Sequence, residues 1–197
     1  MVPLIYSLAF TGGFVIMSLE LLGGRVLAPY FGSSIYVWGS IISVFMLSLA
    51  TGYLIGGSWS VHEPKLRKFG LIFLGSALLL GPLILLSESM MEWVFLRIED
   101  PRYGSLAAAT LLFMVPTIIL GMISPYSVRL LVESVQESGK TAGRLYFVST
   151  LGSSLGTLIT SFYLVLWFEI DQILIGLTAT LLLLWVATFC VSDEERS

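Results

Sequence analysis

Charged side chains are scarce in this sequence. Its 197 residues include 10 Lys and Arg and 13 Asp and Glu, so 12% of the chain is charged while 56% is hydrophobic. A soluble domain is about 25% charged, and this chain has too few charges to cover a water-exposed surface of its size. The composition excludes a soluble globular enzyme and a disordered tail. A net charge of −3 without a basic tract excludes a nucleic-acid binder, which leaves the lipid bilayer as the main solvent.

Cysteine and histidine are almost missing as well. Cys190 is the single cysteine, so the chain forms no internal disulfide, and the single histidine, His62, forms no metal site by itself. No residue spacing matches a metal site, and serine, histidine and acid do not combine in a nucleophilic site. We therefore expect no catalytic site, cofactor or metal in this chain.

Long apolar runs are the dominant feature that is present. Six runs are bounded by charges or turn residues, at about 4–27, 36–57, 70–91, 105–131, 142–167 and 171–191. Each is long enough for a transmembrane helix, which needs about 20 residues, and none shows the alternation of a membrane strand. No Lys or Arg precedes the first run, so we interpret it as a span and not as a cleaved signal peptide. The sequence predicts an all-α membrane protein with six transmembrane helices in one domain over 1–197.

The distribution of Lys and Arg predicts the orientation of these spans. One side holds Lys65, Arg67, Lys68, Arg129, Lys140, Arg144 and Arg196; the other holds Arg25, Arg97 and Arg102. The positive-inside rule then places both termini in the cytoplasm, with the protein in the inner membrane. Lys65, Arg67 and Lys68 are most simply this topology signal. Contact with anionic lipid or a partner, together with Arg129 and Arg144, is the alternative.

Two runs carry small residues at helical spacing. The second run has Ser48, Gly52 and Gly56, and the fifth has Ser149, Gly152, Gly156 and Thr160. Small residues let helices approach closely in a membrane, where lipid tails are as apolar as leucine. We interpret both stripes as helix-packing seams, with a ligand passing beside them as the alternative.

The two halves of the chain resemble each other weakly. The first run ends with GGRVL at 23–27 and the fourth with SVRLL at 127–131, and a small-residue stripe follows each. Three helices followed by three helices have opposite topology, which is the inverted-repeat plan of many transporters. Pro82, Pro116 and Pro125 lie inside or near the end of runs, where we expect kinks.

Of the acidic residues, only Glu20 lies well inside a predicted span. A charge at the centre of a membrane helix costs about 2.5–3.5 kcal/mol. The rise from Leu4 to Glu20 is about 24 Å, which predicts a position nearer the outer interface than the midplane. Arg25 points about 140° away, so the two side chains pair only if the helix unwinds at the adjacent glycines 23 and 24. Glu20 binds a cation, a proton or an amine in one interpretation. In the other, Glu20 and Arg25 form a structural polar network.

Other charges carry weaker signals. Glu88, Glu92, Glu99 and Asp100 cluster around the third connection. An exposed acidic loop explains them better than a cation site. Arg129, Glu133 and Glu137, at spacing four, favour a helical extension of the fourth run or a docking segment.

Two motifs carry a resemblance to a known family. The pattern E-x4-R-x2-A-P-x2-G-x5-W is matched by Glu20, Arg25, Ala28, Pro29, Gly32 and Trp38. The pattern G-R-L-Y-x3-T-L-G-S-x2-G is matched over 143–156. Both resemble the membrane domain of bacterial and archaeal fused spermidine synthase-like proteins, in which helices related to the major facilitator superfamily precede a soluble aminopropyltransferase-like domain. We expect no such soluble domain in this protein, since the six spans take up almost all of the sequence. The connection at 57–68 lacks the charged signature of facilitators.

This resemblance implies half of a facilitator-type bundle and a link to polyamines. The first hypothesis is a non-catalytic membrane subunit that works with a separately encoded spermidine synthase-like protein. The second is a homodimeric half-transporter for a small cationic or amphiphilic solute, with Glu20 in its path. An enzyme acting on a lipid ranks last, because no catalytic constellation is visible.

Overall fold

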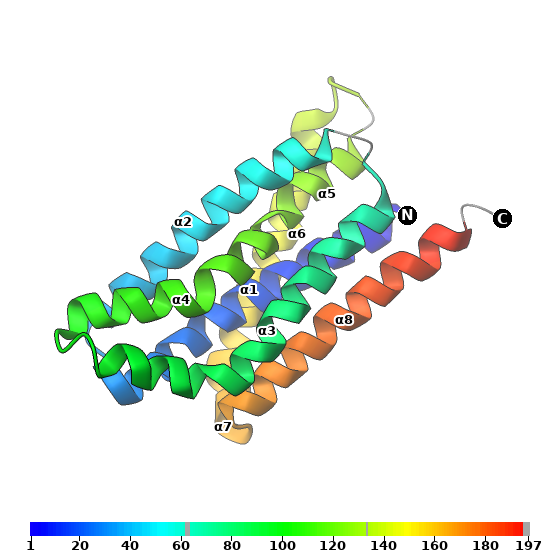
Figure 1. Cartoon of the computed structure of the whole chain (residues 1–197). Helices are drawn as coiled ribbons and strands as arrows, with labels where there is room; N and C mark the ends of the chain where they lie inside the picture. Colours follow the sequence, from blue (N-terminus) through cyan, green and yellow to red (C-terminus); the bar gives the residue numbers. More distant parts are fainter. Residues whose placement is uncertain (62–63, 133, 195–197) are drawn as a thin grey trace.

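The computed structural model is a bundle of long helices and describes residues 1–61, 64–132 and 134–194 (Figure 1). The elements are α1 (Val2–Phe31), α2 (Ile35–Ser60), α3 (Leu66–Phe95), α4 (Pro101–Gly121), α5 (Ile123–Leu131), α6 (Ser138–Ile159), a π-helical turn η1 (Thr160–Leu164), α7 (Val165–Trp167) and α8 (Ile170–Glu194). The start of α1 and the end of α8 lie toward the same end of the bundle in Figure 1. His62, Glu133 and Arg196, named above, lie outside the described residues.

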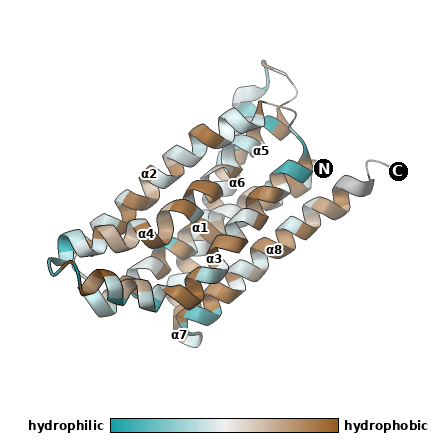
Figure 2. Cartoon of the chain, viewed as in Figure 1, coloured by the Kyte–Doolittle hydropathy of each residue, from teal (hydrophilic) through white to brown (hydrophobic). Residues whose placement is uncertain are grey.

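Six helical segments of the described chain are long and apolar enough to cross a bilayer. They are Val2–Phe31, Ile35–Ser60, Leu66–Phe95, Pro101–Leu131, Ser138–Trp167 and Ile170–Val191. Figure 2 shows hydrophobic residues along the helices and hydrophilic ones mainly near the connections. The predictions of an all-α, multi-pass membrane protein with six spans are confirmed.

Several helices run past the predicted apolar runs. α1 continues from the predicted end near residue 27 to Phe31 and stops at Gly32, whose φ of 77° is left-handed and suits glycine. Hydropathy locates the lipid-embedded part of a helix. The helix itself ends where the backbone turns, so interfacial residues such as Tyr30 remain helical.

The main packing pairs join helices that are distant in sequence. α1 packs against α6, α2 against α4, and α3 against α8. Phe45 of α2 and Phe113 of α4 are fully buried with their ring centres 5.6 Å apart, and Phe73 of α3 is fully buried as well. α6 contributes just three buried residues among those described, Leu145, Gly152 and Gly156, so most of its surface faces outward.

Glycines bring the backbones of two helix pairs into contact. A β-carbon on Gly52 of α2 would overlap the carbonyl oxygen of Ile118 in α4, and one on Gly56 would lie 2.7 Å from the Met122 Cα. On the other side of the bundle, a β-carbon on Gly152 of α6 would overlap the carbonyl oxygen of Phe10 in α1. No larger residue fits at these positions without moving a helix backbone.

Proline breaks one span. The fourth span bends at Met122, between α4 and α5, because Pro125 has no N–H for the Gly121 carbonyl and its ring crowds that carbonyl. Pro82 and Pro116 lie inside α3 and α4 without ending either helix. The π-helical turn η1 was not predicted from the sequence, since an extra residue in a helical turn leaves no periodicity signal.

Candidate functional site

Glu20 lies deeper in its helix than the sequence indicated. α1 spans Val2–Phe31, so Glu20 is about 5 Å past the middle of the helix and about 16 Å before its end. The expected position near the outer interface assumed a helix that ends near residue 27. In the longer helix, Glu20 is closer to the middle of α1.

The neighbours of α1 fix the direction in which Glu20 points. Glu20 follows Gly13 by seven residues and therefore lies within about 20° of it around the helix. Gly13 faces α6, because a β-carbon there would overlap the Ser149 carbonyl and lie 2.8 Å from the Ser153 hydroxyl. Gly24, about 40° from Glu20, faces α2, where a β-carbon would lie 2.7 Å from Trp38. Glu20 therefore lies on the side of α1 that is flanked by α6 and α2.

Glu20 is half-buried and has no polar partner among the described residues. No hydrogen bond or ion pair joins its carboxylate to another residue in the part of the chain that the structure describes. Arg25 is not its partner, because α1 stays helical through the two glycines, and unwinding there was the condition for the pair. Gly23 and Gly24 serve close packing instead: their β-carbons would lie 3.2 Å from the Phe113 ring and 2.7 Å from Trp38.

Arg25 lies beside a different segment. Its exposed side chain lines a hollow of about 410 Å³ together with Phe168, Glu169, Ile170 and Asp171, at the start of α8. The sequence offers no signal for this grouping, because it depends on how the first helix packs against the last connection.

Hydroxyl groups join α1 to α6 next to Glu20. The Thr160 hydroxyl donates to the Ser18 hydroxyl at 2.8 Å, and Ser18 donates to the Gly156 carbonyl at 3.5 Å. Ser18 and Thr160 are fully buried, and Thr160 begins the π-helical turn. These contacts hold the α1 turn just before Glu20 against α6.

Ser48 also has a buried hydroxyl in a seam, but within the described residues it lacks the kind of partner that Thr160 has. Its hydroxyl on α2 makes no hydrogen bond within the described chain, and neither does that of the buried Thr117 on α4. Ser149 is half-buried, and its carbonyl lies against Gly13.

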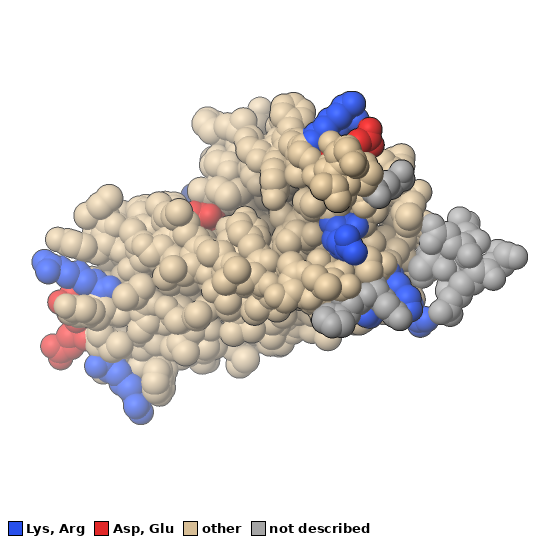
Figure 3. Space-filling model, turned by 90° about the horizontal axis from the view of Figure 1, so that it is seen from above, with Lys and Arg blue, Asp and Glu red and all other residues tan. Residues whose placement is uncertain are grey.

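The basic residues Lys65, Arg67, Lys68, Arg129 and Arg144 lie near the end that carries the two termini. The Tyr126 hydroxyl donates to the Lys65 carbonyl and accepts from the Lys65 amide, both at 3.2 Å. The Arg67 guanidinium lies 4.7 Å from the centre of the Phe189 ring. Arg129 and Arg144 are exposed. Figure 3 shows most charged side chains at the two ends of the body, with largely uncharged surface between them.

The acidic residues Glu88, Glu92, Glu99 and Asp100 are exposed. The Asp100 carboxylate accepts a hydrogen bond from the Arg102 amide at 2.9 Å and so caps the start of α4. Within the described residues, no three His, Cys, Asp or Glu side chains are grouped as metal ligands.

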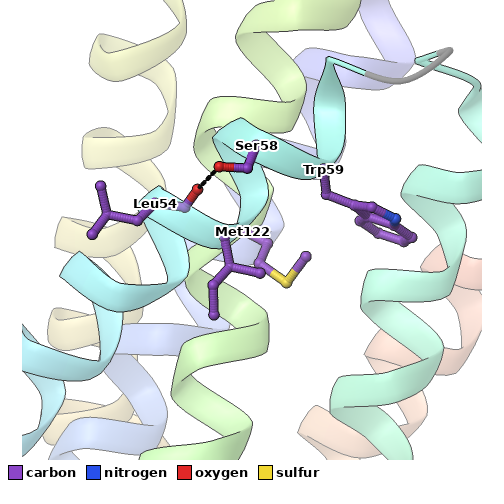
Figure 4. Close-up of a pocket in the computed structure, with 5 residues that line it drawn as sticks. Leu54, Ser58, Trp59 and Met122 are labelled. Atoms are coloured by element: carbon purple, nitrogen blue, oxygen red, sulfur yellow. Dashed lines mark hydrogen bonds between the residues drawn. The ribbon is translucent and has the colours of Figure 1, made fainter.

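An apolar hollow of about 650 Å³ lies at the bend between α4 and α5. Leu54, Ile55, Ser58, Trp59 and Met122 line it (Figure 4). The Ser58 hydroxyl donates to the Leu54 carbonyl at 2.9 Å, so it is already occupied. These lining side chains suit a hydrocarbon chain and offer no charge to a polar ligand.

Comparisons with known proteins add no relative. No protein-family model, no curated protein and no solved structure matches this chain.

Proposed function

We propose that this chain is a non-catalytic membrane unit, built as an inverted repeat, that completes a path for a small cationic solute together with a second subunit. The observation that carries the proposal is the half-buried carboxylate of Glu20 near the middle of α1, which has no partner in the part of the chain that the structure describes. The proposed orientation places both termini in the cytoplasm, in line with the excess of Lys and Arg at their end.

Reciprocal packing supports the inverted repeat. Gly52 of α2 lies against the Ile118 carbonyl of α4, and Gly156 of α6 lies against the Phe14 carbonyl of α1. From Gly52 to Gly156 and from Phe14 to Ile118 the shift is the same, 104 residues. The first contact therefore becomes the second when the two halves of the chain are exchanged.

The same shift relates other features. Gly56 lies against Met122, and the residues 104 positions away, Thr160 and Ser18, are hydrogen-bonded to each other. The third helix of each half also begins in register, α3 at Leu66 and α8 at Ile170. A single shift that holds for seams and helix starts favours a repeat over chance similarity among apolar segments.

The energetics of Glu20 favour a cationic solute. A charged carboxylate near the centre of a membrane helix costs several kcal/mol unless a partner or water satisfies it. The described chain supplies no such partner for Glu20. A cation that binds there would regain this energy, which makes Glu20 the group that selects positive charge.

The exposed surroundings of Glu20 support a second subunit in this proposal. Six helices are half of a facilitator-type bundle, and the flanking α6 is largely exposed. A second copy placed over this side would separate the carboxylate from lipid and enclose a path. The resemblance to spermidine synthase-like proteins suggests a soluble protein of that class as the other candidate partner.

Uptake into proteoliposomes tests the solute path. We expect labelled spermidine or ethylammonium to enter vesicles that contain the protein, and Glu20→Gln to reduce uptake at least tenfold. Taurine, which has no net charge, and the variant Glu99→Gln, whose side chain is exposed at the bundle end, are the controls. Equal uptake by Glu20→Gln and the unaltered protein would contradict the proposal.

The mass of the complex in mild detergent tests the partner. We expect a homodimer at native expression level. A stoichiometric soluble synthase-like protein would instead assign the chain to a membrane subunit of that enzyme, and a monomer without either partner would overturn the proposed assembly.

A further inference from the structure

The hollow beside Arg25 combines opposite charges from separate parts of the chain. Arg25 comes from α1, Glu169 from the connection before α8, and Asp171 from the first turn of α8. All three side chains are exposed, and none forms an ion pair with another residue of the described chain. The hollow of about 410 Å³ thus presents one cation and two anions that remain available to a ligand.

The charges define what the hollow accepts. The Arg25 guanidinium offers a planar set of donors that suits a phosphate. The carboxylates of Glu169 and Asp171 accept hydrogen bonds, so they suit a primary ammonium group. A quaternary ammonium has no proton to donate, and a ligand with negative charge alone meets two carboxylates against one guanidinium.

The position of the hollow matches a lipid headgroup. Its lining residues 168–171 join α7 to α8, at the end of the bundle opposite the start of α1 (Figure 1). Phe168 and Ile170 add apolar surface to its lining, while the adjacent Trp167 is 79% exposed, as expected for an aromatic residue at the bilayer interface. A headgroup bound here keeps its acyl chains beside the exposed surface of the neighbouring helices.

We propose that this hollow binds the headgroup of a phospholipid that carries both a phosphate and a primary ammonium, as phosphatidylethanolamine does. Arg25 holds the phosphate, and Glu169 and Asp171 hold the ammonium. The site is separate from Glu20 and does not depend on the proposed solute path.

Lipid retention measured by native mass spectrometry tests this site. The protein is reconstituted in nanodiscs with equal amounts of phosphatidylethanolamine, phosphatidylcholine and phosphatidylglycerol, then released. We expect at least tenfold preferential retention of phosphatidylethanolamine. Arg25→Gln and the double variant Glu169→Gln/Asp171→Asn should each lower that retention about tenfold, and the double variant should also gain phosphatidylglycerol.

Matched variants separate this effect from a change in folding. Arg25→Lys keeps the charge and should restore part of the retention, while Arg97→Gln and Glu99→Gln alter exposed charges outside the hollow and should leave it unchanged. Equal retention of the three lipids by the unaltered protein, as expected if Arg25 closes directly onto Asp171, would overturn the proposal. Binding of free phosphoethanolamine as tight as that of the lipid would overturn its assignment to a lipid headgroup.

Discussion

The two glycine seams share a backbone geometry and differ in their chemistry. In the α1–α6 seam the buried hydroxyls of Ser18 and Thr160 are bonded to each other, a π-helical turn begins at Thr160, and a carboxylate follows two residues after Ser18. In the α2–α4 seam the buried hydroxyls of Ser48 and Thr117 make no bond within the described chain. α2 contains no charged residue, and the charged residue of α4 is Arg102 in its first turn. Close packing is thus common to both seams, while the hydroxyl pair and the carboxylate lie at the α1–α6 seam alone among the described residues.

Adding a methyl group to a seam glycine should have the largest effect. We expect Gly52→Ala and Gly156→Ala to lower the free energy of unfolding by about 2–3 kcal/mol each, because the new β-carbon meets the carbonyl of a facing helix. Unfolding titrations in mixed micelles measure this. The control glycines 57 and 143 have nothing within 4 Å, so alanine there should be neutral or slightly stabilising. Comparable losses at the controls would mean that the seams do not hold the bundle.

Neutralising Glu20 should have the second-largest effect on stability. We expect Glu20→Gln to raise the free energy of unfolding of the solute-free protein by about 1–2 kcal/mol, because the charge is half-buried without a partner in the described chain. The same titrations compare it with Glu88→Gln, at an exposed position. A loss of stability instead would show that the carboxylate holds helices together, which is the structural interpretation of Glu20.

Removing a buried hydroxyl should change the free energy of unfolding by a smaller amount, and differently in the two seams. Thr160→Val deletes the bond to Ser18, so we expect a loss of about 1 kcal/mol. Thr117→Val removes a buried hydroxyl that has no partner in the described chain, so it should be neutral or stabilising. Thermal unfolding of both variants measures the difference. Equal shifts would mean that the Ser18–Thr160 bond adds nothing to the α1–α6 seam.

Sequence reasoning located the spans well and the contacts between them less well. Hydropathy identified six spans because each helix must satisfy its own backbone in lipid, a local requirement. It placed the end of α1 too early and left open whether the helix unwinds at Gly23 and Gly24, because the packing of Phe113 and Trp38 against those glycines depends on other helices.

The candidate site shows the same division. Glu20 stands out in the sequence as an acid inside an apolar run. The grouping of Arg25 with Glu169 and Asp171 joins residues far apart in the chain, so no local pattern could reveal it.

The sequence by itself determined the solvent, the number of spans and the placement of most charges at the span ends, because the cost of burying charge in lipid acts on each segment separately. The tertiary structure decided which helices touch, which glycine meets which carbonyl, and which hydroxyls and charges find a partner. Those outcomes depend on how closely two helix backbones approach each other. That distance is set by the packing of the whole bundle and not by any single helix.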